Sequence, residues 1–219
     1  MESKILIIRH GITEGNKKKW FYGATDIGLC EEGVSELIEQ RNSGFYPDIP
    51  EGAQFFTTGM KRTEETLEIL FGDVEHGRIT DMKEMNFGDY ECRAFDSLKD
   101  DELFLEWGYD QIGEVKLPNG ESRNEFRERT RRGGQFLIDE HIAKNVPMTV
   151  MICHGGVISS FMDHLFGDER SMWDWMPEPG CGYEIILKDG KPVRYEAIGR
   201  IGDKLQTMID EYESENGED

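Results

Sequence analysis

Two short apolar runs, each ending in a histidine followed by glycine, constrain this chain most. The stretch Lys4–Gly11 ends in Arg-His-Gly, and the stretch Thr149–Gly155 ends in His-Gly. Short apolar runs bounded by turn-forming residues are typical of buried strands. Ligands of open α/β sheets bind just outside the carboxyl ends of such strands. If the two strands are neighbours, the imidazoles of His10 and His154 face each other across one pocket.

The charge of the chain excludes several classes of partner. The 219 residues carry 25 basic and 45 acidic side chains, a formal net charge of −20. A surface of this charge repels nucleic acids and anionic membranes, so we expect neither as a partner. It also repels phosphate, and any anion site must therefore be a local cluster of cations.

Cysteine usage and the first residues favour the cytoplasm. No apolar run approaches the length of a membrane span, and the start of the chain lacks the pattern of a signal peptide. The cysteines are widely spaced and form no C-x-x-C pair, which argues for a reducing compartment and against a zinc site or a disulfide framework. They are Cys30, Cys92, Cys153 and Cys181.

Apolar strand patterns alternate with helical patterns along the chain, which favours an α/β fold. We expect a three-layer sandwich with a mostly parallel central sheet and helices on both faces. The expected strands include residues 4–8, 54–58 and 149–153, and the expected helices include residues 31–41, 97–107, 124–143 and 157–166. Residues 183–187 and 193–198, joined by Asp189-Gly190, predict a hairpin. No domain boundary is evident, so residues 1–219 are interpreted as one domain with an acidic tail from about residue 211.

The residues at the predicted strand ends suit an oxyanion. Arg62 follows the strand at residues 54–58, as Arg9 and His10 follow the first strand. Arginine presents a planar fork of donors that matches phosphate. Asn16 adds a neutral donor, and the backbone amides of Gly11 and Gly155 are expected to approach the anion closely. An imidazole can also attack phosphorus, and a carboxylic acid can protonate the leaving group.

The segment Arg9–Asn16 resembles the signature of the histidine phosphatase superfamily, the family of phosphoglycerate mutase and its phosphatase relatives. Five further blocks resemble the motifs of that family in the same order. They are Tyr22–Leu29, Thr58–Thr66, Glu84–Glu91, Pro118–Ser122 with the later Arg129, and Cys153–Gly156.

The resemblance implies roles for individual residues. His10 would be the nucleophile that becomes phosphohistidine, and Glu84 would protonate the leaving group and then activate water. The phosphoryl oxygens would be held by Arg9, Arg62 and His154, with help from Asn16, Gly11, Gly155, Thr13 and Gly23. Glu14 and Asp89 are competing carboxylates. The family needs no metal, so no cofactor is expected.

Departures from the family pattern favour a phosphatase. Trp20 stands where many relatives carry arginine, and Gly15 stands where the mutases usually carry tryptophan. The longer inserts of the cofactor-dependent mutases have no match. We therefore expect a metal-independent phosphomonoester hydrolase that acts on a small phosphorylated metabolite. The alternatives are a cofactor-dependent phosphoglycerate mutase and a non-catalytic module that binds a phosphorylated ligand. Specificity is expected in residues 87–123, and a homodimer is left open.

Several other side chains have two interpretations. The lysines Lys17–Lys19 either reach a second anionic group or are solvated. The arginines of the long predicted helix are interpreted as one solvated face, with gating of the substrate as the alternative; these are Arg123, Arg127, Arg131 and Arg132. Trp173 and Trp175 are interpreted as core residues, with the pocket rim as the alternative. His76 and His141 are expected at the surface, and His164 in the core or at an interface.

Overall fold

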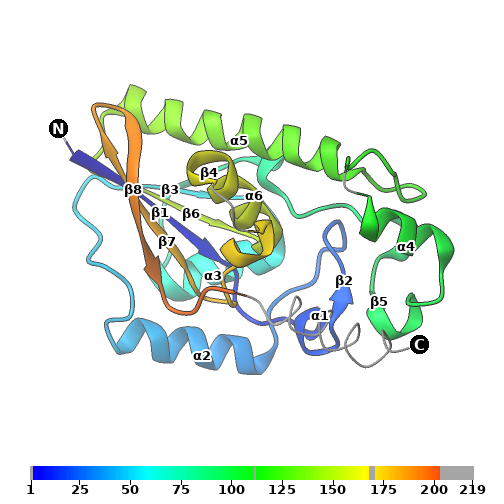
Figure 1. Ribbon diagram of the computed structural model, residues 1–219. Helices are drawn as coiled ribbons and strands as arrows, with labels where there is room; N and C mark the ends of the chain where they lie inside the picture. Colours follow the sequence, from blue (N-terminus) through cyan, green and yellow to red (C-terminus); the bar gives the residue numbers. More distant parts are fainter. Residues whose placement is uncertain (1, 111, 168–170, 203–219) are drawn as a thin grey trace.

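A six-stranded sheet forms the middle layer of the fold (Figure 1). The computed structural model describes residues 2–110, 112–167 and 171–202. The strands follow the order β4-β3-β6-β1-β7-β8. Their bounds are β1 (Glu2–Arg9), β3 (Gln54–Thr57), β4 (His76–Arg78), β6 (Met148–Cys153), β7 (Gly182–Lys188) and β8 (Lys191–Ile198). β4, β3, β6 and β1 are parallel, whereas β7 is antiparallel to β1 and β8 to β7. The mostly parallel sheet expected from the sequence is confirmed.

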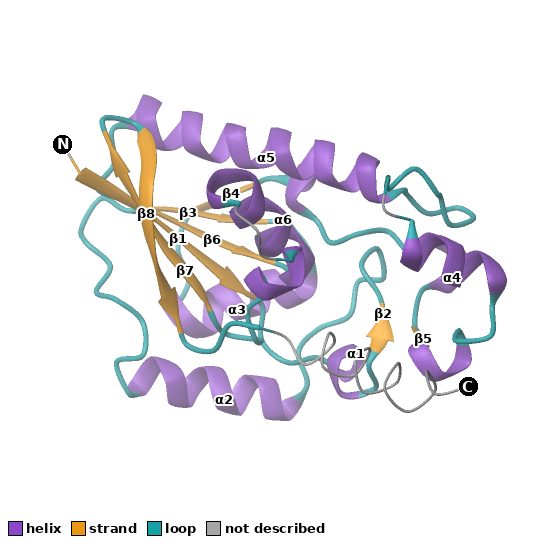
Figure 2. Cartoon of the chain, viewed as in Figure 1, coloured by secondary structure: helices purple, strands orange, loops and turns teal. Residues whose placement is uncertain are grey.

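Helices cover both faces of this sheet (Figure 2). α2 (Glu31–Asn42) and α3 (Lys61–Phe71) cover one face, and α5 (Arg123–Lys144) and α6 (Gly155–Phe166) cover the other. Side chains of β1 alternate between the two interfaces, as strand geometry requires. Ile5 and Ile7 belong to the core cluster that contains side chains of α5 and α6, and Leu6 and Ile8 belong to the cluster with side chains of α2 and α3. The three-layer sandwich is therefore confirmed.

Shorter elements lie beyond the carboxyl ends of the parallel strands (Figure 1). They are α1 (Glu14–Lys17), β2 (Trp20–Phe21), β5 (Arg93–Ala94) and α4 (Glu102–Tyr109). β2 pairs antiparallel with β5, outside the main sheet. Single turns of 3-10 helix occur at Thr80–Met82, Gly88–Tyr90, Phe95–Ser97 and Met172–Trp175. Of these elements, α1, β2, α4 and the turn at Met172–Trp175 contribute side chains to the wall of a pocket at this edge.

Two local elements differ from those expected. Residues 14–17, where no helix is predicted, form α1 because Thr13 and Asn16 make a capping box. The helix expected from residue 97 begins at Glu102. Its start is fixed by Asp101, whose carboxylate accepts the amide hydrogen of Phe104.

The long helix and the hairpin follow the prediction closely. α5 begins after Ser122, whose hydroxyl accepts the amide hydrogen of Glu125 in a capping box. Two glycines inside α5 permit close packing, because a Cβ on Gly134 would lie 2.3 Å from the ring of Phe161 on α6. β7 and β8 are joined by Asp189 and Gly190 in the left-handed region, as a two-residue hairpin turn requires.

No helix within residues 2–110, 112–167 and 171–202 is long and apolar enough to cross a membrane. The acidic tail expected from about residue 211 lies outside the described residues.

Candidate active site

The register of β1 and β6 places the two histidines side by side. Arg9 at the end of β1 pairs with Cys153 at the end of β6, so both chains leave the sheet at the same level. The next residues are His10 and His154, whose ring centroids lie 5.3 Å apart in an edge-to-face arrangement. His10 is 3% exposed and His154 is fully buried. The juxtaposition expected from two strand ends is present in the structure.

The hydrogen bond of His10 fixes its tautomer. Its Nδ1 lies 2.8 Å from the carbonyl oxygen of Gly11. A carbonyl oxygen can only accept, so Nδ1 carries the proton and Nε2 of the neutral ring keeps its lone pair. Burial, and then the positive charges of Arg62 and Arg9, hold the pKa of His10 well below its ordinary value. His10 is therefore a neutral imidazole with an unprotonated Nε2.

The proton arrangement around His154 is also fixed by its partners. Arg62 donates its Nε–H to Nδ1 of His154 over 3.2 Å, so Nδ1 is the acceptor. Nε2 then donates to Oγ1 of Thr58 over 2.9 Å. Thr58 Oγ1 lies 3.2 Å from that of Thr63, which in turn donates to the carbonyl of Met60. Burial, and then the positive charge of Arg62, hold the pKa of His154 well below its ordinary value.

Arg62 is fully buried and is held by the loop that follows β2. Its NH2 and NH1 groups donate to the carbonyls of Gly23 (2.9 Å) and Thr25 (3.0 Å), and its guanidinium lies over the ring of Tyr22. Burial lowers the pKa of Arg62. The loop thus fixes a cation behind the two imidazoles.

Glu91 holds that loop, and the sequence analysis gave it no role. Its carboxylate accepts the amide hydrogens of Gly23, Ala24, Thr25 and Phe87, together with the hydroxyl of Thr25, at 2.7–3.1 Å. Glu91 therefore positions Arg62 through the loop. Its only sequence signal is its place at the end of the Glu84–Glu91 block.

Asn16 is oriented by Thr13 and Tyr22. Its Oδ1 accepts the amide hydrogen of Thr13 (3.0 Å) and the hydroxyl of Tyr22 (3.1 Å). Because a backbone amide can only donate, this oxygen assignment leaves the NH2 group of Asn16 on the opposite side. Asn16 lines the pocket, so this NH2 group is a suitable donor for an anion.

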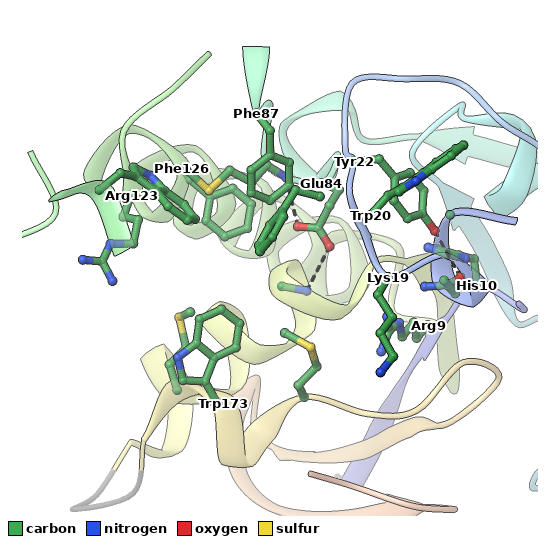
Figure 3. Close-up of a pocket in the computed structure, with 18 of the residues that line it drawn as sticks. Arg9, His10, Lys19, Trp20, Tyr22, Glu84, Phe87, Arg123, Phe126 and Trp173 are labelled. Atoms are coloured by element: carbon green, nitrogen blue, oxygen red, sulfur yellow. Dashed lines mark hydrogen bonds between the residues drawn. The ribbon is translucent and has the colours of Figure 1, made fainter. Parts of the chain in front are cut away.

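Glu84 is held at the start of α6. Its carboxylate accepts the amide hydrogens of Gly156 (3.0 Å) and Met85 (2.9 Å), as the dashed lines in Figure 3 show. The backbone of this segment is held by Arg129, which donates to the carbonyl of Glu84 and pairs with the carboxylate of Glu121. The Pro118–Ser122 block and Arg129 thus serve to place Glu84. The two other carboxylates considered as the acid do not lie in this position. Glu14 is exposed on α1, and Asp89 accepts a hydrogen bond from the side chain of Asn119.

These residues meet in a cavity of about 430 Å³. Figure 3 shows Arg9, His10 and Lys19 at one end, Glu84 between the ends, and Arg123 at the other end. Among the described residues, the charged side chains that line it are Arg9, Lys19, Arg123, Arg127 and a single carboxylate, Glu84. In a chain of net charge −20, this pocket is the local cluster of cations that an anion requires.

Of the predicted site residues, Arg9, His10, Asn16 and Glu84 line the cavity, whereas the others lie behind its wall. The residues behind the wall are Gly11, Thr13, Gly23, Arg62, His154 and Gly155.

The expectation that Gly11 and Gly23 help to hold the phosphoryl oxygens is corrected, because both backbone amides already donate within the fold. The amide of Gly11 donates to Thr66 Oγ1, and that of Gly23 donates to Glu91. Thr13 is likewise used inside the fold, as the cap of α1. Gly155 opens α6 beside the guanidinium of Arg9.

Three further expectations need correction. Arg123 and Arg127 line the pocket, whereas Arg131 and Arg132 pair with Glu128 and Asp81 on the outer face of α5. Trp173 also lines the pocket, while Trp175 is buried in the core. His141 is buried between Thr149 and Ser3 rather than at the surface. His164 is exposed, so of its two expected places the core is excluded.

Of the Lys17–Lys19 run, only Lys19 lines the pocket; Lys17 pairs with Glu32, and Lys18 lies over the ring of Trp20. Within the described part of the chain, no group of three or more His, Cys, Asp or Glu side chains is placed to hold a metal ion.

Comparison with known proteins identifies the family. Residues 5–199 match the model of the histidine phosphatase superfamily (branch 1). The chain belongs to the histidine phosphatase superfamily. Among its superfamily relatives, a phosphoglycerate mutase of Schizosaccharomyces pombe is 26% identical, with 89% of this chain and 95% of the relative aligned. A 2,3-bisphosphoglycerate-dependent phosphoglycerate mutase of Parvibaculum lavamentivorans is 28% identical, with 98% and 100% aligned.

Solved structures of the superfamily share the fold. A putative alpha-ribazole-5'-P phosphatase from Escherichia coli superposes with a TM-score of 0.75 at 21% identity, covering 92% of this chain and 96% of that one. A phosphoglycerate mutase from Bacillus anthracis gives a TM-score of 0.73 at 19% identity, covering 90% and 91%. Structures named as a putative phosphatase and as a mutase therefore both share the fold of this chain.

Proposed function

We propose that this chain is a phosphomonoester hydrolase that acts through a phosphohistidine at His10 on a small phosphorylated metabolite. The observation that carries the proposal is the bond from His10 Nδ1–H to the carbonyl of Gly11, which leaves Nε2 unprotonated. This nucleophile lies at the cationic end of the pocket, which Arg9 and Asn16 also line, and the positive charge of Arg9 and the NH2 group of Asn16 suit the phosphoryl oxygens. These groups neutralise the phosphoryl charge without requiring a metal ion.

In the first step, Nε2 of His10 attacks phosphorus while the bond from phosphorus to the ester oxygen breaks. The departing alkoxide takes a proton from the carboxyl group of Glu84, which the amides of Gly156 and Met85 hold in place. Arg62 contributes positive charge beside the neutral ring of His154, and that ring packs edge to face against His10 and helps to orient it. The products of this step are the free alcohol and a phosphoryl group on His10.

In the second step, the Glu84 carboxylate removes a proton from a water molecule. The water oxygen bonds to phosphorus, the bond from nitrogen to phosphorus breaks, and inorganic phosphate leaves. Glu84 and His10 regain their starting protonation states, so the same carboxyl group serves both steps.

A mutase is the second candidate, because relatives 26–28% identical over most of the chain carry that name. The lining of the pocket favours the hydrolase. Its wall holds many aromatic and methionine side chains, which suit an apolar alcohol better than a small phosphorylated acid. A coupled mutase assay with the bisphosphate cofactor separates the two: phosphoglycerate turnover there, without release of phosphate from other esters, favours the mutase.

A cytoplasmic location belongs to the same proposal. All four cysteines are free thiols, which fits a reducing compartment.

The proposal is tested by phosphate release from a panel of phosphomonoesters in the presence of EDTA. The wild type is compared with His10→Ala and with His164→Ala, which removes an exposed histidine of α6. EDTA-resistant release that is lost in His10→Ala and kept in His164→Ala supports the proposal. Binding of an ester with no release at any pH favours the binding module, and unchanged turnover in His10→Ala contradicts a nucleophilic role.

A further inference from the structure

The pocket is built in two chemically different parts, and only one of them is used by the proposed reaction. The reacting part holds Arg9 and His10 at one end with Glu84 next along the cavity, whereas the remaining wall is aromatic and ends in Arg123 (Figure 3). We infer that the substrate is a phosphate monoester of a bulky aromatic alcohol that carries a second anionic group, held by Arg123. This inference rests on the proposed hydrolase activity and names the class of its substrate.

The aromatic wall is preorganised by contacts among its own rings. Phe21 and Phe87 meet edge to face at 5.5 Å, and Phe87 and Trp107 meet at 5.8 Å. Phe104 lies behind them, 4.9 Å from Phe21 and 5.6 Å from Trp107 between centroids. Rings locked in this way lose little freedom when a flat apolar group packs on them.

Further apolar side chains complete the lining and give it a second side. Phe126 lies beside Phe87, and Trp173 faces them from the opposite side of the cavity (Figure 3). Met85, Met172 and Met176 also line the cavity. A cavity of about 430 Å³ suits a ring system, whereas a small polar alcohol leaves most of these side chains without a ligand contact.

Arg123 is the feature that points to a second anion. It lines the cavity and lies over the ring of Trp107. Its Nε and NH2 atoms are buried and have no hydrogen-bond partner among the described residues. Burial, followed by the charge of Arg127, lowers the pKa of Arg123. An unpaired, partly desolvated guanidinium is costly, and an anionic ligand group offsets that cost.

The two arginines of α5 that line the pocket differ from the other three. Arg129, Arg131 and Arg132 each form an ion pair with a carboxylate, whereas neither Arg123 nor Arg127 forms one with a described residue. The acidic side chain near Arg123 is Asp110, whose two oxygens accept the amide hydrogens of Ile112 and Val115. Asp110 therefore holds its own loop, and Arg123 remains available to a ligand.

The placement of Arg123 sets the order of groups along the substrate. Arg123 lies at the opposite end of the pocket from Arg9 and His10, with the aromatic wall between them (Figure 3). A ligand that reaches both ends has its phosphoryl group at His10, its ring system against the wall and its second anionic group at Arg123.

The test uses three esters: ethyl phosphate, naphthylmethyl phosphate, and naphthylmethyl phosphate with a carboxylate on the far ring. All three leaving groups are primary alkoxides, so the intrinsic reactivity of the esters is matched. We expect the wild type to hydrolyse the naphthylmethyl ester with a kcat/KM at least about tenfold above that of the ethyl ester. The carboxylate should add about another tenfold, as a charge-assisted hydrogen bond does.

Three variants divide the two parts of the inference. Arg123→Gln should remove the gain from the carboxylate and keep the preference for naphthylmethyl over ethyl. Trp173→Leu should reduce the preference for naphthylmethyl several-fold. Arg131→Gln, on the same helix but paired with Glu128, is the control and should change neither ratio. Thermal unfolding of each variant checks that the fold is intact.

The outcomes separate the two claims. Equal kcat/KM values for ethyl and naphthylmethyl phosphate, or an undiminished carboxylate gain in Arg123→Gln, overturn the inference while leaving the hydrolase intact. Failure of the wild type to hydrolyse any of the three esters contradicts the hydrolase and the inference together.

Discussion

Arg62 donates its Nε–H to Nδ1 of His154 over 3.2 Å, and this bond makes the second histidine a neutral acceptor. A cation that donates to an imidazole opposes its protonation, and burial acts in the same direction. His10 has the same two influences, burial and nearby arginines. The folded protein therefore keeps both imidazoles neutral at a pH where the unfolded chain protonates them.

This difference predicts a loss of stability in mild acid. Below pH about 6.5 the unfolded chain binds protons that folded His10 and His154 do not, so the free energy of unfolding falls as the pH falls. The slope is at most about 1.4 kcal/mol per pH unit for each histidine. Replacement of His10 by Gln should reduce the slope between pH 6.5 and 5, measured by urea unfolding. The exposed His164→Gln is the control, and identical slopes in wild type and His10→Gln contradict the account.

Glu84→Gln should separate esters by their leaving groups. The amide cannot protonate an alkoxide, so kcat for alkyl phosphates should fall about 100-fold or more. An activated aryl phosphate, whose leaving group needs no proton, should still transfer its phosphoryl group to His10. Steady-state and burst kinetics on both esters measure this difference. If Glu84→Gln lowers the rate of phosphorylation of His10 equally for alkyl and aryl phosphates, relative to the wild type, Glu84 is not the acid.

Glu91 should behave as a positioning residue. Glu91→Ala leaves the amides of Gly23 and Thr25 without their acceptor and frees the loop that holds Arg62. We expect a loss of about 2 kcal/mol in the free energy of unfolding, together with a lower kcat/KM. Glu91→Asp should restore part of both, and denaturant unfolding with initial rates measures them. Full activity in a destabilised Glu91→Ala variant shows that the loop does not position Arg62.

Gly23 is expected to tolerate no side chain. A Cβ there would lie 1.8 Å from the carbonyl oxygen of Met85, next to Glu84. Gly23→Ala should therefore lower the free energy of unfolding by about 1–3 kcal/mol and reduce kcat/KM. Gly108→Ala is the matched control, because nothing lies within 4 Å of a Cβ at that position of α4. If Gly23→Ala is as stable and as active as Gly108→Ala, the backbone around Gly23 can move to accommodate a side chain, and the prediction is wrong.

The sequence predicts the layers of the fold and the reacting end of the pocket because both depend on local patterns. The apolar run of β1 and the Arg-His-Gly that follows it place His10 at a strand end without further information. The register that sets His154 beside His10 is a property of paired strands, and two matching motifs were enough to expect it.

The supporting contacts could not be predicted in the same way. Glu91 acts through backbone amides 66–68 residues away, and nothing in its local sequence encodes that partner. The resemblance places Gly11 and Gly23 among the residues that help to bind phosphate, but buried amides need partners within the fold, and these two donate to Thr66 and Glu91. Arg123 was interpreted as solvated because helical periodicity shows its position on α5 but not the aromatic wall facing it.

The central claim is that His10 carries the phosphoryl group, and intact mass measurement after mixing with an activated aryl phosphate tests it directly. Glu84→Gln is the protein of choice, because it should form the phosphoenzyme and hydrolyse it slowly. The account predicts a mass increase of one phosphoryl group, which is located on His10 after an alkaline quench. The double variant Glu84→Gln, His10→Ala should show no such increase. Phosphate release without any adduct on His10, or an adduct on another residue, would contradict the account.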